Sequence, residues 1–269
     1  MTGLAASERS SSPNVPALAG ALLAGALVAW IVTVARMRGM DAGPGTDLGG
    51  LGWYLGIWVT MMAAMMLPSV TPMVLLFARV SAERKKRGSA HVSTWTFLAG
   101  YFAAWTAYGL VAYVFYRLVT TVGSGFFAWQ RGGPYVAGGA VAAAGLYELT
   151  PLKGMCLRHC RSPLHFLLAG WRRGNAGALR MGSEHGAYCV GCCWGLMVIL
   201  FALGVMSLLW MAVVASVIFA QKVLPRGDRL ALPFALACVA FAVCVAAFPD
   251  RVPGLTQPGA PAMHMSPMK

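Results

Sequence analysis

The stretch LGWYLGIWVTMMAAMMLPSVTPMVLLFA, residues 51–78, carries no charged side chain. About 20 apolar residues in a helix are enough to cross the roughly 30 Å of hydrocarbon in a bilayer, and this stretch is longer. Pro68 and Pro72 lie inside it and predict a kink, because proline removes a backbone hydrogen bond from a helix. We therefore expect a kinked membrane-spanning helix here, and the rest of the chain decides how many others accompany it.

The same apolar character extends over the whole chain. Of its 269 residues, 58% are hydrophobic and 11% are charged, and the mean hydropathy is +0.67. Soluble domains carry roughly 25% charged residues, so this chain has too few polar side chains to coat a soluble globule. The composition excludes a soluble enzyme, a collagenous or disordered chain and a small disulfide scaffold. It predicts an all-α, polytopic helical bundle in the lipid bilayer, with six to seven transmembrane helices.

Further apolar runs lie at residues 17–35, 94–116, 134–150, 190–220 and 231–248. As a single helix, the run 190–220 would be about 46 Å long, which exceeds one bilayer, so we favour two helices with a break near Gly204–Ser207. The sequence predicts one transmembrane domain at 17–249, which includes a basic, cysteine-containing loop at 151–186. A disordered tail is expected before it at 1–16, and a flexible tail rich in methionine, histidine and proline is expected after it at 250–269.

The basic excess, with 21 lysines and arginines against 8 acidic residues, is interpreted as a topology signal. With seven spans and an inside N-terminus, 15 of these 21 cations fall in inside segments. This asymmetry is typical of cytoplasmic loops, so we expect no nucleic-acid partner. It predicts a multi-pass protein of the bacterial inner membrane, with its N-terminus in the cytoplasm and its C-terminal tail outside.

Five of the seven cysteines fall in two short clusters, Cys156-Leu-Arg-His159-Cys160 and His185-Gly-Ala-Tyr-Cys189-Val-Gly-Cys192-Cys193. In a helix, Cys156 and Cys160 would share one face, and His185, Cys189 and Cys192 would share another, with Cys193 at its edge. Two such faces opposite each other would surround a metal with thiolates and imidazoles, which suit Cu(I) or Zn²⁺ better than Mg²⁺ or Ca²⁺. The candidate ligands are Cys156, Cys160, Cys189, Cys192, Cys193, His159 and His185.

Methionine supplies a second soft ligand. Met62, Met66, Ser69 and Met73 recur along one face of the helix expected at residues 51–78. A thioether is a neutral ligand, so Met62 and Met66 are candidates for an intramembrane Cu(I) relay, although methionine also fills gaps in apolar cores. The terminal segment 263–268, Met-His-Met-Ser-Pro-Met, has the side chains for capturing a soft metal.

Two polar positions stand beside apolar runs. Glu148 lies at the end of the run 134–150, and an acid at such depth in a membrane protein is paired or marks a pathway. Lys153 is its expected partner. Gln221 and Lys222 follow the apolar run 190–220 and are expected at the membrane interface.

Three motifs together resemble those of a family of predicted metal-binding integral membrane proteins, formerly of unknown function. They are W-x-x-M-x-x-A-M-M-x-P at 58–68, Y-x-x-x-x-x-K-x-x-C-L-x-x-C-R-x-P at 147–163 and G-x-x-C-x-G-C-C-W-x-L-M at 186–197. The G-C-C-W element is the most specific, and the resemblance spans roughly residues 53–224. It implies copper handling, because members of the family are linked to copper supply for tyrosinase-type polyphenol oxidases.

The chain departs from the family pattern at two places. The first cysteine cluster has the spacing C-x-x-x-C, whereas the family more often has C-x-x-C. Gln221-Lys222 stands where the family often has Glu-Lys, which weakens the case for ion coupling at that position.

The sequence thus predicts a non-enzymatic membrane protein that binds Cu(I), or alternatively Zn²⁺, and passes it to a copper-receiving protein. Three other functions fit the same residues. They are a thiol–disulfide oxidoreductase using Cys189 and Cys192, a metal transporter with a sulfur-lined path, and a scaffold whose cysteines only pack. The expected inside position of both clusters disfavours the oxidoreductase, since the cytoplasm is reducing.

Overall fold

The computed structural model describes residues 14–38, 48–88, 92–122, 133–203 and 207–248. Among its long helices, α2 (Leu51–Lys86) is the most deeply buried. The other elements within these ranges are α1 (Val15–Met37), α3 (Thr94–Val122), α4 (Gly133–Tyr147), α5 (Pro151–Arg161), α6 (Pro163–Gly170), α7 (Gly174–Leu203), α8 (Leu208–Val223), the short 3-10 helix η1 (Gly227–Leu230) and α9 (Ala231–Ala247). In the described parts of the chain every regular element is a helix, as predicted.

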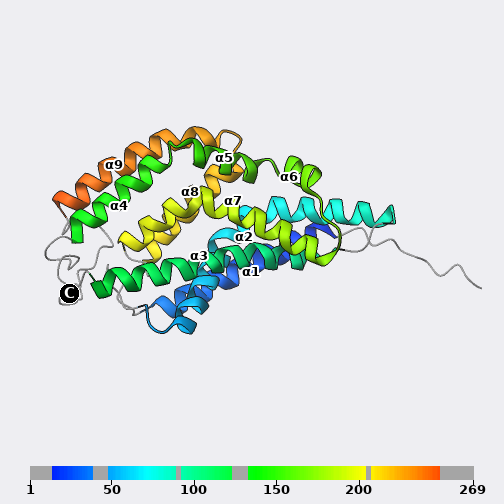
Figure 1. Cartoon of the computed structure of the whole chain (residues 1–269), viewed down its shortest axis with the longest axis horizontal. Helices are drawn as coiled ribbons and strands as arrows, with labels where there is room; N and C mark the ends of the chain where they lie inside the picture. Colours follow the sequence, from blue (N-terminus) through cyan, green and yellow to red (C-terminus); the bar gives the residue numbers. More distant parts are fainter. Residues whose placement is uncertain (1–13, 39–47, 89–91, 123–132, 204–206, 249–269) are drawn as a thin grey trace, which may run out of the picture.

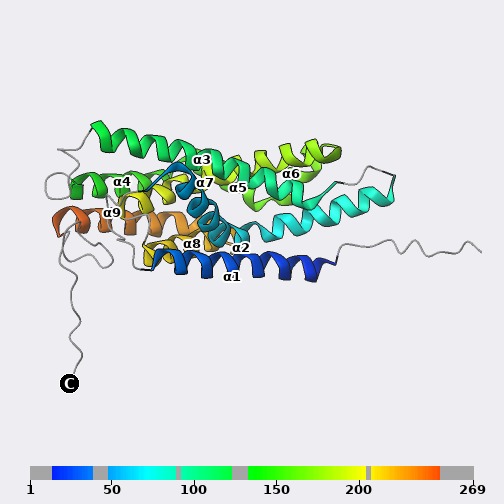
Figure 2. The same cartoon turned by 90° about the horizontal axis from the view of Figure 1, so that it is seen from below.

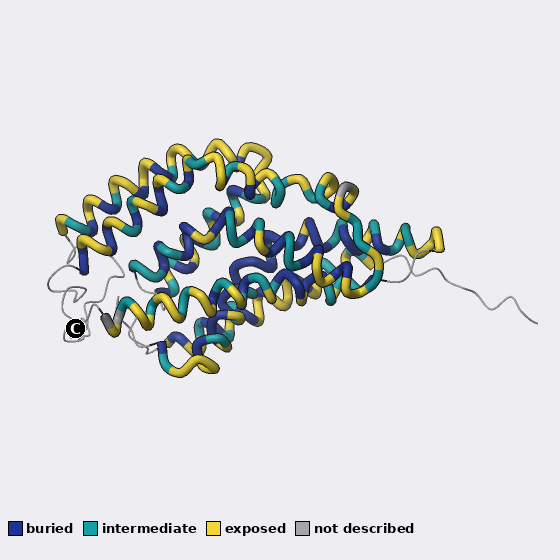
Figure 3. Tube along the Cα trace, viewed as in Figure 1, coloured by how far each residue is buried: buried dark blue, intermediate teal, exposed yellow. Residues whose placement is uncertain are grey.

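The long helices lie side by side along the long axis of the molecule (Figure 1 and Figure 2). Neighbours in the bundle pack as pairs, with α1 along α2, α3 along α7 and α4 along α9. The inward faces of α2 and α7 carry most of the buried positions, whereas the outer faces of α4 and α9 are exposed (Figure 3). The core is therefore built around α2 and α7, the two helices whose sequence motifs are most distinctive.

The helix α2 is continuous through both prolines but changes direction along its length (Figure 2). The hydroxyl of Thr71 donates to the Leu67 carbonyl at 2.7 Å, and that of Ser69 donates to the Met66 carbonyl at 3.0 Å. Proline and such hydroxyl bonds to the preceding turn both bend helices. Pro68 and Pro72 flank Ser69, which lines the site described below together with Met73.

Five helical segments are long and apolar enough to cross a membrane, namely those in α1, α2, α3, α7 and the continuous η1–α9. The helix α8 is apolar but shorter, and α4 has 15 residues. The predicted long run 190–220 is divided between α7, which ends at Leu203, and α8, which begins at Leu208. This confirms two helices rather than one.

The segment 151–186, expected to be a basic loop, is instead helical and forms α5, α6 and the first part of α7. Thr150 caps α5 by accepting a hydrogen bond from the Lys153 amide, and Pro151 occupies the first turn, where its missing N–H costs nothing. The expectation of a loop came from the polar, basic composition of this segment. Its basic residues lie instead on helices such as α5, where Arg158 is exposed and Cys156 and Leu157 are buried.

Close contact between α3 and α7 depends on small residues. A Cβ added at Gly182 would overlap the carbonyl of Phe97, and one at Gly100 would overlap that of Leu179. Glycine lets two backbones approach in this way, and such pairs are common between helices in membranes. The approach sets Tyr101 of α3 against the cysteine-bearing face of α7. The predicted terminal tails, apart from residues 14–16, lie outside the described residues, as do Gly204–Met206.

Candidate metal centre

Three cysteines of α7 form a compact group of sulfur atoms. Cys189, Cys192 and Cys193 are buried, and their Sγ atoms all lie within 4.8 Å of one another. The Sγ atoms of Cys192 and Cys193 are 3.3 Å apart, and none of the three is in a disulfide. Because α7 starts at Gly174, this part of the chain is in the middle of a helix, as the predicted one-face spacing requires.

The other predicted cluster contributes a fourth sulfur. Cys160, at the end of α5, places its Sγ atom 3.8 Å from that of Cys192 and remains partly exposed. Cys156, one turn earlier, is buried against α7, where a Cβ added at Gly191 would lie 2.7 Å from its Sγ atom. Burial raises the pKa of the Cys156 thiol. Cys156 lies outside the compact group, so α5 contributes one partly exposed sulfur to the cluster.

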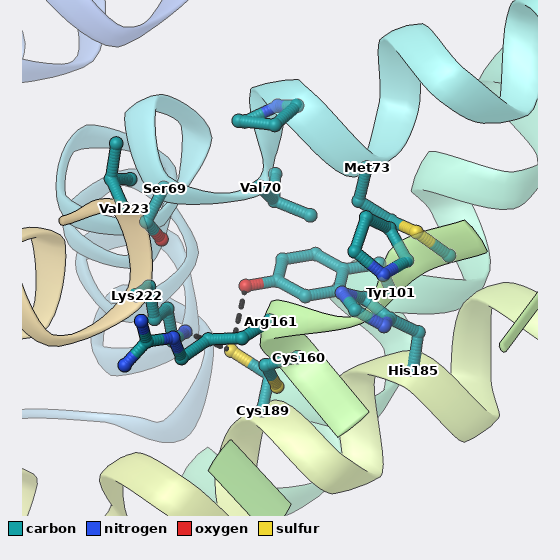
Figure 4. Close-up of a pocket in the computed structure, with 12 residues that line it drawn as sticks. Ser69, Val70, Met73, Tyr101, Cys160, Arg161, His185, Cys189, Lys222 and Val223 are labelled. Carbon is teal, nitrogen blue, oxygen red and sulfur yellow. Dashed lines mark hydrogen bonds between the residues drawn. The ribbon is translucent and has the colours of Figure 1, made fainter. Parts of the chain in front are cut away.

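Two polar side chains from other helices bind the Cys189 sulfur. The Lys222 ammonium, at the end of α8, donates to Cys189 Sγ at 2.8 Å. The hydroxyl of Tyr101, from α3, lies 2.9 Å from the same atom (Figure 4). Sequence reasoning missed both residues, since Tyr101 belongs to no motif and Lys222 was assigned to the interface. A lysine following an apolar helix gives no sign of the helix against which it will fold.

A cavity of about 210 Å³ opens beside these sulfurs (Figure 4). Its lining comes from α2, α3, α5, α6, α7 and α8, and includes Cys160, Cys189, Lys222, Tyr101, His185, Met73, Ser69 and Arg161. Cys160 and Cys189 face the cavity, whereas Cys192 and Cys193 are not part of its lining. A small ion in this cavity would therefore meet Cys160 and Cys189 before Cys192 and Cys193.

The cavity wall between α5 and α8 is fixed by Arg161. Its guanidinium donates to the Leu224 and Pro225 carbonyls at 2.9 and 2.7 Å and pairs with Asp228 at 2.9 Å. These bonds tie the residue after Cys160 to the turn that follows Lys222. The positions of Cys160 and Lys222 are thus linked through one side chain.

The two predicted histidine ligands have different surroundings. His185 lines the cavity and is buried among Phe97, Tyr101 and Phe166, and its Nδ1 atom has no hydrogen-bond partner within the described structure. His159 stacks on Tyr188 with ring centroids 4.3 Å apart, and its Nδ1 atom lies 2.9 Å from the Met155 carbonyl. Only His185 is available beside the sulfurs.

The methionine face of α2 reaches the cavity through a different residue from the two predicted. Met73 lines the cavity, together with Ser69. Met62 and Met66 lie on the same face of α2 but are fully buried and do not contribute to the lining. Of the three methionines on this face, Met73 is therefore the one that shares a cavity with Cys160 and Cys189.

A buried polar network lies next to the sulfur site. The Lys153 ammonium forms an ion pair with Glu148, as predicted, and donates to Gln221 Oε1 at 2.9 Å. The Gln221 amide nitrogen in turn donates to Glu148 at 2.7 Å. Gln221 was expected at the interface but is 2% exposed. Gln221 is buried because its amide forms hydrogen bonds with both Lys153 and Glu148. These three side chains come from different segments, so the sequence around Gln221 does not reveal the contact.

Comparison with known proteins gives one family. The family model described as PpoB2, copper chaperone, matches residues 55–245. No curated protein and no solved structure gives a significant match to the chain. The matched region includes all four sulfurs of the cluster, Lys222, Tyr101 and the methionine face of α2. Since it covers well over half of the sequence, the chain belongs to the PpoB2 copper chaperone family.

Proposed function

We propose that this protein is an integral membrane copper chaperone that binds Cu(I) through Cys189, Cys192 and Cys193, exchanges it through Cys160, and delivers it to a cuproenzyme of the polyphenol oxidase type. The observation that carries the proposal is the buried group of three thiols within 4.8 Å of one another, in a chain of a copper chaperone family. A chaperone passes its metal on, so membership of the family implies a copper-receiving partner and favours a non-catalytic role.

The chemistry of the site favours Cu(I) as the cargo. Soft thiolates and thioethers prefer Cu(I), whereas structural Zn²⁺ is usually held by four ligands in a closed tetrahedron. Here three sulfurs are buried and the fourth, Cys160, is partly exposed at the cavity. Three buried sulfurs that hold the ion and one partly exposed sulfur that can exchange it suit metal transfer. Met73 offers a further soft ligand on the same cavity, and Met62 and Met66 would extend a relay along α2.

The surface of the bundle supports a membrane location. Large apolar side chains are exposed on its outer helices, such as Leu27 of α1 at 62%, Val111 of α3 at 67% and Leu236 of α9 at 61%. Such faces are stable in contact with lipid and not with water. Adding α4 and α8 to the five long apolar segments gives the seven spans expected from the charge asymmetry. We propose an inner-membrane location with a cytoplasmic N-terminus.

Metal analysis of protein purified in detergent tests the proposal. Wild type expressed with copper should carry about one equivalent of Cu(I), and the double variant C189S/C192S should carry almost none. The matched control is C238S/C244S in α9, whose thiols are outside the cluster, and it should retain wild-type copper. Equal copper in wild type and C189S/C192S would contradict the proposal.

A thiol oxidoreductase remains the second candidate because the Cys192 and Cys193 sulfurs are only 3.3 Å apart. It predicts a disulfide that forms and breaks during turnover and no stoichiometric metal. Counting free thiols in protein purified with and without copper separates the two functions. The chaperone should keep all seven thiols reduced when metal-loaded, whereas an oxidoreductase should lose two thiols under mild oxidation and show activity towards protein disulfides.

A further inference from the structure

The charge of the Lys222 side chain is unmatched by any carboxylate in the described residues. Its ammonium lies 2.8 Å from the sulfur of Cys189, which is 1% exposed. None of the ion pairs between described residues includes Lys222. The other strong cation on the cavity, Arg161, is paired with Asp228. In the described part of the chain, the positive charge at the sulfur site therefore faces the Cys189 thiol and is not paired with a carboxylate.

The neighbouring network explains why Lys222 points at the sulfur. Gln221 is held by Lys153 and Glu148 at 2.9 and 2.7 Å, so the end of α8 is fixed in rotation about its axis. Arg161 fixes the turn that follows, through the Leu224 and Pro225 carbonyls. The residues before and after Lys222 are thus both held in place, and this keeps its ammonium at the Cys189 sulfur.

Lys222 is part-buried, and a cation that is largely removed from water is stabilised by an opposite charge. A monovalent ion held by two of the cysteines as thiolates, with the other cysteines kept as neutral thiols, forms a complex with a net charge of −1, which one ammonium neutralises. A divalent ion on the same two thiolates forms a neutral complex and leaves the ammonium without a counter-charge. We propose that Lys222 makes the cysteine site select monovalent soft cations over divalent ones. This inference rests on the proposed function, since it requires that the cysteines bind metal.

The experiment compares two soft ions that share a preference for linear coordination by two thiolates, Ag(I) and Hg(II). Full-length protein in detergent is titrated with each ion in competition with N-acetylcysteine, and the ratio of the two affinities is measured. Relative to N-acetylcysteine, the wild type should favour Ag(I) over Hg(II). In K222M this ratio should fall by about tenfold or more, because the Ag(I) complex loses its counter-charge and the Hg(II) complex loses an unpaired cation. K222R should keep the wild-type ratio.

The matched control is K86M, at a lysine whose side chain is 50% exposed on α2, and it should leave the ratio unchanged. Unfolded K222M would bind both ions like N-acetylcysteine and would also lower the ratio, so the comparison uses K222M whose circular dichroism spectrum and thermal midpoint match those of the wild type. The wild-type comparison with N-acetylcysteine does not depend on any variant. A wild-type ratio equal to that of N-acetylcysteine, or an unchanged ratio in K222M, would overturn the inference while leaving the copper site intact. Failure of the wild type to bind either ion would overturn the proposed function and the inference with it.

Discussion

The end of α8 takes part in two buried polar regions that differ in one respect. Gln221 enters the network of Glu148 and Lys153, where every charge has a partner and both ionised side chains are 1% exposed. The next residue, Lys222, enters the sulfur site, where a cation faces thiols and a cavity. The first region is complete as folded, whereas the second has a charge and an open space that an anionic metal complex would fill.

These two regions show how a stable bundle can hold the proposed transfer site. A buried ion pair with all its hydrogen bonds made is costly to break, because removing one partner leaves the other charge unpaired. Such a network fixes α4, α5 and α8 relative to one another. The sulfur site can then expose one sulfur, that of Cys160, beside the cavity without loosening the helices that carry it.

The largest effect is expected in the complete region. K153M should lower the free energy of unfolding by about 3–5 kcal/mol, because Glu148 would be left buried without its partner. Denaturant unfolding in detergent measures this. The double variant E148L/K153M should recover much of the loss, since no unpaired charge remains. A double variant as unstable as K153M would show that the network stabilises the fold in some other way than through its charges.

The next effect separates holding from exchange within the sulfur site. C160S should still bind Cu(I), with an affinity lowered by about tenfold (about 1.4 kcal/mol), because three sulfurs remain. Transfer to an external Cu(I) chelator, followed by absorbance in stopped flow, should slow by about tenfold as well. C192S, which removes a buried sulfur, should instead lower the copper content. Equal losses in the two variants would contradict the separate role of Cys160.

The sequence was sufficient for the features that depend on neighbours along the chain. Charge-free runs predicted the helices, the spacing of His185, Cys189 and Cys192 predicted one face, and the depth of Glu148 predicted its pairing with Lys153. The basic character of 151–186 was misleading, because a helix can place arginines on one side and cysteines on the other. Polarity alone does not distinguish such a helix from a loop.

What could not be predicted depends on contacts between distant segments. Tyr101 and Lys222 reach Cys189 from 88 and 33 residues away, and neither distance leaves a local pattern. The same limit applies to Met73. Its spacing placed it on one face with Met62 and Met66, but only the packing of α2 against α3, α6 and α8 selects which thioether meets the cavity.

A smaller effect is expected at Tyr101. Y101F removes one hydrogen bond to the Cys189 sulfur and leaves the packing of the ring in place. The free energy of unfolding should change by about 1 kcal/mol, the usual net value of one such bond. Copper content should stay at the wild-type level. A loss of copper comparable to that in C192S would place Tyr101 among the groups that bind the metal and not among those that orient a ligand.

The smallest effect distinguishes Met73 from the rest of the methionine face. M73L conserves side-chain volume and should leave both stability and copper content close to wild type, since exchanges between leucine and methionine cost less than about 1.5 kcal/mol. Transfer to the external chelator should slow by about two- to threefold, because a neutral soft ligand on the cavity is lost. M62L, at a fully buried position outside the cavity lining, is the matched control and should transfer at the wild-type rate. Equal slowing in M62L would contradict this distinction and would extend the proposed exchange path along α2 to residues outside the cavity.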